Sequence, residues 1–149
     1  MSVARVSFRP IPAIRLGALP CYRIAMIGFT ELELAALHSM FAEVPDLVPT
    51  LEQQLSVASV AKRENTGVGF FTTINVPQAS EAVERSEPLS GETHARLPSL
   101  THGLGFVLFF DGGCIATLEG FTYGSETTSG LDLTNLSFDI VRVPVNRVD

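Results

Sequence analysis

Glu119 is the residue whose type and position most strongly suggest chemistry. It ends the apolar run 115–118 and precedes Gly120, so a carboxylate falls at the end of a predicted strand. Phe121 and Tyr123 follow at a spacing of two, which in an extended strand places all three side chains on one face. An acid beside two aromatic rings is the composition of a surface that binds a ligand or a protein. The same pattern also fits an ordinary sheet face covered by a loop, and the sequence leaves both interpretations open.

A catalytic role for Glu119 makes further demands. A general acid or base needs a perturbed pKa and a second group within hydrogen-bonding distance, and His102 and Tyr123 are the candidates for that group. The simpler alternative is a glutamate that faces solvent or pairs with an arginine, since neighbouring residues of a strand point to opposite faces. The sequence therefore predicts ligand or partner contacts at Glu119, Tyr123, Phe121 and His102 and assigns no catalytic residue.

Motifs of known chemistry are missing from the sequence. It contains no phosphate-binding loop, no dinucleotide fingerprint, no zinc-protease helix and no nucleophile-elbow pentapeptide. Two cysteines and three histidines provide neither a disulfide framework nor a standard metal-ligand spacing. We therefore expect no metal and no cofactor, and an enzyme is the less favoured interpretation.

Composition limits the class of protein. The chain has 149 residues, of which 46% are hydrophobic and 17% charged, so it is long enough for one packed domain and too apolar to be disordered. It has no run of about 20 uncharged apolar residues, as a membrane-spanning helix would require. The net charge of −6 argues against general binding to nucleic acid.

The charge is divided unevenly along the chain. Residues 1–30 contain four arginines and no acid, whereas residues 31–149 contain 6 basic and 16 acidic residues, a net charge of −10. Three interpretations fit the basic segment: a targeting peptide, a basic arm that lies on the acidic body, or a wrongly assigned start with translation beginning at Met26. We expect residues 1–25 to be such an arm or wrong start, dispensable for folding, and residues 26–149 to form a single α+β domain.

Two helices are expected first. Thr30 and Glu33 form a capping-box pattern before a helix at 31–44, whose apolar residues Leu34, Leu37, Met40, Phe41 and Val44 share one face, with Leu32 off that face. Pro45 should end this helix. A second short helix carries Leu51 and Leu55, with Asp46 or Thr50 as its cap.

The rest of the chain predicts mainly strands. They are expected at 56–63, 68–76, 104–110, 114–119 and 136–141, with Asp111-Gly112 as a tight turn and 77–98 as a long loop that holds one short edge strand near 94–97. The Phe-rich strands 68–76 and 104–110 are the candidates for the sheet centre. Helices followed by strands indicate an α+β fold, with an N-terminal helix pair packed on a mostly antiparallel sheet of about five or six strands.

Two segments resemble a pattern found in a known group of proteins. The segment 102–112 reads HGLGFVLFFDG and 118–124 reads LEGFTYG, and together they resemble a pattern in a family of small uncharacterised bacterial proteins without an established activity. The resemblance covers about residues 26–141 and implies an accessory or immunity-type protein. Where a Trp or Pro would be expected after the GFTYG segment, this chain has the sequence SETT at 125–128.

These observations predict a non-catalytic binding or interaction protein with an acidic surface. A basic protein is the expected partner, because an acidic surface steers its association, and immunity-type neutralisation is the concrete form. The alternative is a small ligand-binding domain or an enzyme that uses Glu119 with Tyr123 and His102. We expect a bacterial, cytoplasmic protein that binds neither nucleic acid nor membrane, of undetermined oligomeric state.

Overall fold

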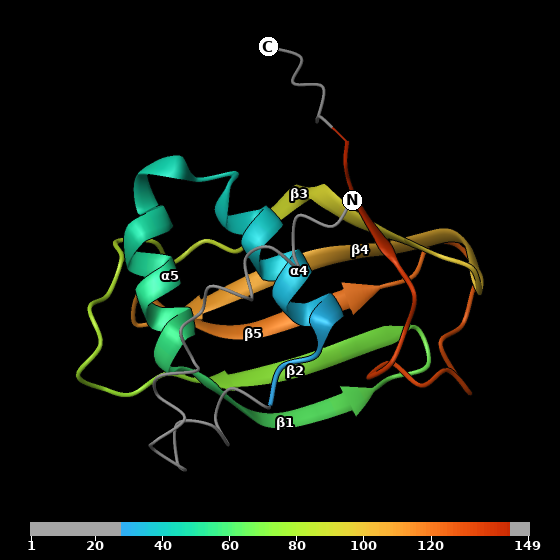
Figure 1. The fold of residues 1–149 in the computed structure, drawn as a ribbon, viewed down its shortest axis with the longest axis horizontal. Coiled ribbons are helices and arrows are strands. Elements are labelled where there is room, and N and C mark those ends of the chain that lie inside the picture. Colours follow the sequence, from blue (N-terminus) through green and yellow to red (C-terminus); the bar gives the residue numbers. More distant parts are fainter. Residues whose placement is uncertain (1–27, 144–149) are drawn as a thin grey trace.

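The structure, a computed structural model, describes residues 28–143. The basic arm or wrong start expected at 1–25 lies outside the described residues. Two α-helices and one 3-10 turn precede six strands in the chain (Figure 1). Their bounds are α4 Glu31–Phe41, η1 Pro45–Leu47, α5 Val48–Val57, β1 Ser59–Asn65, β2 Gly69–Asn75, β3 Leu89–Leu97, β4 Leu100–Asp111, β5 Cys114–Phe121 and β6 Asp139–Arg142.

The strands form one sheet in the order β1-β2-β5-β4-β3-β6, in which every neighbouring pair is antiparallel. Both helices lie against the same face of this sheet (Figure 1). Helix α4 contacts β3, β4 and β6, and α5 contacts β5. The predicted α+β class, with a helix pair on an antiparallel sheet, is confirmed.

Helix α4 begins as its sequence predicts. The Thr30 hydroxyl accepts a hydrogen bond from the Glu33 N–H at 3.0 Å, and the Glu33 carboxylate accepts one from the Thr30 N–H at 2.9 Å. The helix ends at Phe41, before the predicted Val44, because the last turn tightens into 3-10 bonds such as that from the Val44 N–H to the Phe41 carbonyl. Leu32, which the sequence pattern places off the apolar face, is buried.

Helix α5 starts without a side-chain cap. Leu47 occupies the N-cap position and makes no capping hydrogen bond, so the predicted caps Asp46 and Thr50 are both wrong. Pro49 lies in the first turn, where a missing N–H costs nothing. The buried residues of the helix include Leu51 and Leu55, as the sequence pattern indicated.

Strand β3 is the largest difference from the sequence-based expectation. A long loop with one short edge strand is predicted there, yet Leu89–Leu97 is a strand of 9 residues between β4 and β6. Its sequence is locally polar and contains Gly91, which argues against a strand. Pairing on both sides and burial of Leu89, Ala95 and Leu97 in the core supply the stabilisation that local propensity lacks.

The centre of the sheet is also partly different. Strands β5 and β4 are central, whereas β2, one of the two predicted central strands, has only β1 between it and the sheet edge. The turn between β4 and β5 has Gly112 and Gly113 as its central residues, with φ of 60° and 80°, so it lies one residue later than predicted. Because β5 is a central strand, Glu119 lies in the middle of the sheet.

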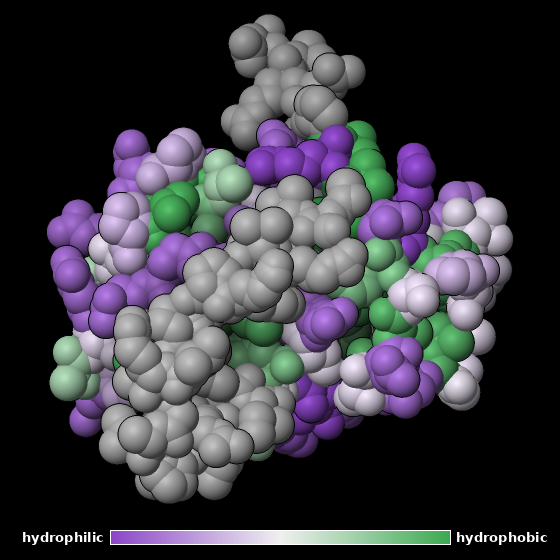
Figure 2. Space-filling model, viewed as in Figure 1, coloured by the Kyte–Doolittle hydropathy of each residue, from purple (hydrophilic) through white to green (hydrophobic). Residues whose placement is uncertain are grey.

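The core lies between the helices and the sheet. It is formed by side chains from α4 and α5, such as Leu37, Met40 and Leu51, and from the strands, such as Phe106 and Leu118. Figure 2 views this helix-covered side, where hydrophilic and hydrophobic residues are interspersed. Within residues 28–143, no helix is long and apolar enough to cross a membrane.

Candidate functional site

The sheet face opposite the helices is not packed against either helix, and we call it the open face. Its apolar residues do not belong to the core cluster and are half-buried. Strand alternation and cross-strand pairing assign to it Phe71, His94, Gly105, Val107, Phe109, Thr117, Glu119, Phe121 and Val141.

Glu119 lies at the centre of the open face. Its direct cross-strand partners are Phe71 on β2 and Val107 on β4. Directly opposed residues of antiparallel strands point to the same face, so the carboxylate side chain is flanked by an aromatic ring and an aliphatic side chain. Phe121, two residues further along β5, adds a second ring on the same face.

The Glu119 carboxylate is half-buried and has no hydrogen bond or ion pair with any of residues 28–143. Burial raises its pKa above the ordinary value of 4.5, because removing water from around a carboxylate disfavours its charged form. No neighbouring cation or donor offsets this effect in the described part of the chain.

The cross-strand neighbours Phe71, Glu119 and Val107 form one row of the open face, and a second row lies beside it. Phe121 of β5 is opposite Gly105 of β4, which is opposite His94 of β3. Because Gly105 has no side chain, Phe121 and Tyr123 lie directly over it: a Cβ there would come within 2.5 Å of the Phe121 Cζ and of the Tyr123 hydroxyl. The missing side chain of Gly105 therefore makes the space in which the two rings pack.

Tyr123 is held in this space by two contacts. Its hydroxyl lies 2.8 Å from His94 Nδ1, at hydrogen-bonding distance, and its ring meets that of Phe121 edge to face with centroids 5.4 Å apart. Burial raises the pKa of the Tyr123 hydroxyl above its ordinary value. We call Phe71, His94, Val107, Glu119, Phe121 and Tyr123 together the Glu119 patch.

The structure brings three of the four predicted site residues onto the open face. Glu119, Phe121 and Tyr123 belong to the patch, but His102 does not: its ring Nδ1 lies 3.1 Å from Glu126 Oε2, in the loop after β5. Neither His102 nor Tyr123, the two candidates for a second group beside Glu119, makes a hydrogen bond to it within residues 28–143, and Tyr123 pairs with His94 instead. His94 was not predicted as a site residue, although a short edge strand was expected near 94–97, because no local signal shows that this strand lies beside β4 and brings His94 to Tyr123.

A buried ionic cluster lies on the other side of the sheet. Glu33 is 2% exposed and accepts hydrogen bonds from Arg63 Nε at 2.7 Å, Arg63 Nη2 at 2.8 Å and the Thr72 hydroxyl at 2.5 Å, besides the Thr30 N–H. Arg63 also donates to the Gly28 carbonyl. These hydrogen bonds join α4 to β1 and β2, which gives the cluster a structural role.

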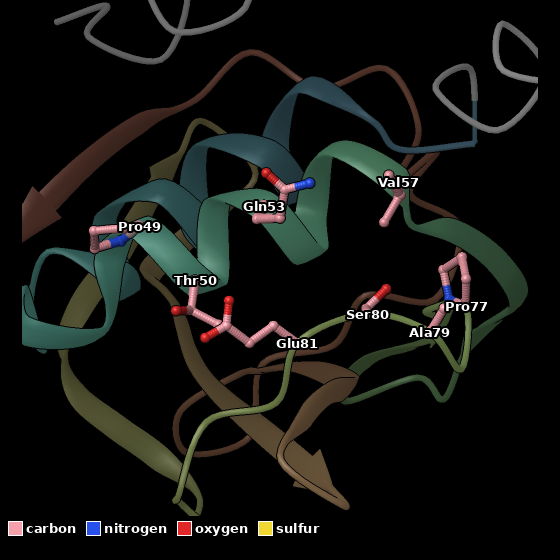
Figure 3. A pocket seen from close by; sticks show the side chains of 8 residues that line it. All are labelled: Pro49, Thr50, Gln53, Val57, Pro77, Ala79, Ser80 and Glu81. Carbon is pink, nitrogen blue, oxygen red and sulfur yellow. The ribbon is translucent and has the colours of Figure 1, made fainter.

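A pocket of about 560 Å³ opens between α5 and the segment that follows β2. Figure 3 shows Thr50 and Gln53 of the helix on one side and Pro77, Ser80 and Glu81 on the other. None of its lining residues belongs to the open face. Its charged residue, Glu81, is exposed, so the pocket presents no buried charged group to orient a ligand.

We expect Glu119→Gln to leave the fold intact and to raise the free energy of unfolding at pH 7 by no more than about 0.5 kcal/mol, because the side chain is partly exposed and solvent screens its charge. The folded-state pKa is raised, so the folded state binds a proton at a higher pH than the unfolded state does. Wild-type stability must therefore fall as the pH rises from the ordinary value of 4.5 through the raised pKa.

Urea unfolding between pH 4 and pH 8 measures this difference, with the exposed Glu84→Gln, in the segment 77–88 outside the strands of the sheet, as the control variant. The Glu119→Gln variant should have a higher free energy of unfolding than the wild type at pH values above that window, and the same free energy of unfolding below it. A loss of more than about 1 kcal/mol at pH 7 would instead mean that the carboxylate makes a stabilising contact.

Among residues 28–143, no group of three histidine, cysteine or acidic side chains is placed to hold a metal ion. Comparison of the chain with protein-family models, with curated proteins and with solved structures found no match.

Proposed function

We propose that this protein is a non-catalytic interaction protein that binds a basic protein partner through the open face of its sheet. The observation that carries the proposal is the unpaired, half-buried Glu119 carboxylate in the middle of an apolar and aromatic surface. Its carboxylate has hydrogen-bonding capacity that no group of residues 28–143 uses, and a cation from a partner would pair with it as the interface excludes water. Immunity-type neutralisation of the partner requires only such a complementary surface.

The composition of the patch supports protein binding. Aromatic residues are enriched at the centres of protein interfaces, where they bury large areas with little loss of side-chain entropy. Phe71 is opposite Glu119 and Phe121 is two residues along β5, while Tyr123 packs on Phe121. The hydrogen bond between Tyr123 and His94 holds the Tyr123 ring in place before binding. A preorganised surface loses less conformational entropy on association.

The charge of the chain supports a basic partner. Residues 31–149 carry a net charge of −10, which attracts a positively charged protein over a distance and raises the rate of association. The acidic residues are spread over the helices and the loop 77–88 as well as the sheet. They therefore contribute steering, while Glu119 contributes the short-range contact.

The arrangement favours catalysis less. The nearest acid-base pair of the patch, His94 and Tyr123, is satisfied by its own hydrogen bond, and neither residue bonds to Glu119. The pocket between α5 and the segment 77–81 contains none of the residues of the Glu119 patch.

The experiment is capture from native lysate with three immobilised proteins: wild type, Glu119→Gln and Glu31→Gln. Glu31 is an exposed acid at the start of α4, on the helix side, so its variant removes the same charge from the opposite side of the molecule. A basic protein held by the wild type is then purified, and its dissociation constant is measured for each variant at about 50 mM and 500 mM salt.

We expect Glu119→Gln to weaken the purified pair by about tenfold or more, because truncating one partner of a desolvated charge pair leaves the other unpaired. Glu31→Gln should change the affinity only slightly, and high salt should slow association. Equal binding by all three proteins, or no protein retained by the wild type, would contradict the proposal.

A further inference from the structure

We infer that the group received beside Glu119 is an arginine side chain of the partner, flanked by apolar residues, rather than a lysine. This inference rests on the proposed function and specifies the chemistry of the partner at the same site. It follows from the geometry around one carboxylate and from the difference between the two basic side chains.

Among the residues that the structure describes, both oxygens of the Glu119 carboxylate are free to accept hydrogen bonds. Neither of its carboxylate oxygens accepts a hydrogen bond from residues 28–143. Both are therefore available to one incoming group. A guanidinium donates two parallel N–H bonds to the two oxygens of a carboxylate, whereas an ammonium occupies the site as a single point charge.

Aromatic side chains lie beside Glu119. Phe71 is the cross-strand neighbour of Glu119 on β2, and Phe121 lies two residues along β5. A planar guanidinium stacks on aromatic rings while it bonds to a carboxylate in the same plane, and this combination is unavailable to an ammonium.

Hydration also favours a guanidinium over an ammonium at this site. The site is half-buried, so the incoming cation loses part of its water. A guanidinium is more weakly hydrated than an ammonium and is therefore transferred to such a surface at a smaller cost. The apolar surroundings, with Val107 on the other side of the carboxylate, favour apolar residues on both sides of the arginine in the partner.

The other charged residues that the structure describes near the site do not occupy the place of an incoming cation. Lys62 on β1 and Arg96 on β3 are exposed, and neither pairs with Glu119. On β1, the residue beside Phe71 is Glu64, which adds negative charge at the edge of the site. No cation of residues 28–143 therefore fills the site in place of the partner's arginine.

The test uses two synthetic probes, acetyl-Leu-Arg-Leu-amide and acetyl-Leu-Lys-Leu-amide, titrated into the isotope-labelled full chain. NMR signals of the Val107 methyl groups and of the Phe71 and Phe121 rings report on the open face, and those of Leu37 and Leu51 report on the helix side. The same titrations are made with Glu119→Gln and with the control Glu31→Gln.

We expect the arginine probe to perturb the open-face signals and to bind at least about threefold more tightly than the lysine probe. Glu119→Gln should weaken the arginine probe by about tenfold and remove the difference between the two probes, and Glu31→Gln should not.

Equal affinities for both probes would overturn the arginine inference. No binding of either probe, or perturbations confined to the helix side, would overturn it as well. The proposed function is judged separately, by whether binding of the captured partner depends on Glu119, so failure of one proposal is distinguishable from failure of the other.

Discussion

Arg63→Met is expected to lower the free energy of unfolding by about 3 kcal/mol, because it leaves the Glu33 carboxylate charged and buried without its cation. The substitution removes two hydrogen bonds to Glu33 and one to the Gly28 carbonyl. The Glu33 side chain is 3% exposed and that of Arg63 is 27% exposed, so water replaces the lost guanidinium only in part. The hydrogen bond to Glu33, more than its charge, also raises the pKa of Arg63 above its ordinary range.

Urea unfolding at pH 7 measures the loss, and Lys62→Met is the matched control. Lys62 is the neighbouring residue on the same strand, but it is exposed and makes no ion pair within residues 28–143, so its substitution should change stability by less than about 0.5 kcal/mol. Adding Glu33→Gln to Arg63→Met should recover part of the loss, because the buried charge is then gone. A single-variant loss below about 1 kcal/mol would show that the pair contributes little.

Gln54→Leu is expected to lower the free energy of unfolding by about 2–4 kcal/mol, since it leaves the buried Ile115 N–H without its acceptor and removes a donor from the Glu81 and Gly113 carbonyls. Gln54 is fully buried: its amide donates to the Glu81 and Gly113 carbonyls at 2.8 and 3.0 Å and accepts from the Ile115 N–H at 3.0 Å. One side chain thus joins α5 to the loop after β2 and to the β4–β5 hairpin. Leucine has a similar volume, so the loss reflects missing hydrogen bonds rather than a cavity.

The control for this change is the preceding residue on the same helix. Gln53 is exposed, so Gln53→Leu should change stability by less than about 0.5 kcal/mol. Amide hydrogen exchange adds a local measurement, because the Ile115 N–H should lose protection in Gln54→Leu and keep it in Gln53→Leu. Equal stability of both variants would contradict a structural role for the buried amide.

The Glu119 patch was partly predictable from the sequence. The spacing of Glu119, Phe121 and Tyr123 follows from the two-residue period of a strand, which is a property of the backbone itself. That period places side chains on a common face without saying whether a helix or solvent covers the face. The pairing of Tyr123 with His94 joins residues 29 apart in the chain, and in the sequence alone His102 is an equally reasonable candidate.

Among the buried polar residues, too, the local contacts were predictable from the sequence and the long-range contacts were not. The capping box of Thr30 and Glu33 spans three residues, and its pattern alone located the start of α4. That Glu33 also binds Arg63, 30 residues later, depends on β1 lying beside the helix terminus. The helical spacing of Leu51 and Leu55 places Gln54, and not Gln53, on the apolar face of α5. Only the tertiary structure supplies the backbone groups that the buried Gln54 amide binds.

By itself, the sequence determined the features that depend on a few neighbouring residues: the start of α4, the strand pair joined by a tight turn, the α+β class and the common face of Glu119 and Phe121. The tertiary structure decided the strand β3, the central position of β5, the partners of Tyr123 and Arg63, and which sheet face the helices leave open. The physical reason is that local features follow from backbone geometry and side-chain period, which act over short distances along the chain. Strand order, burial and ion pairing are chosen by competition among contacts far apart in sequence, and a single sequence does not state the outcome of that competition.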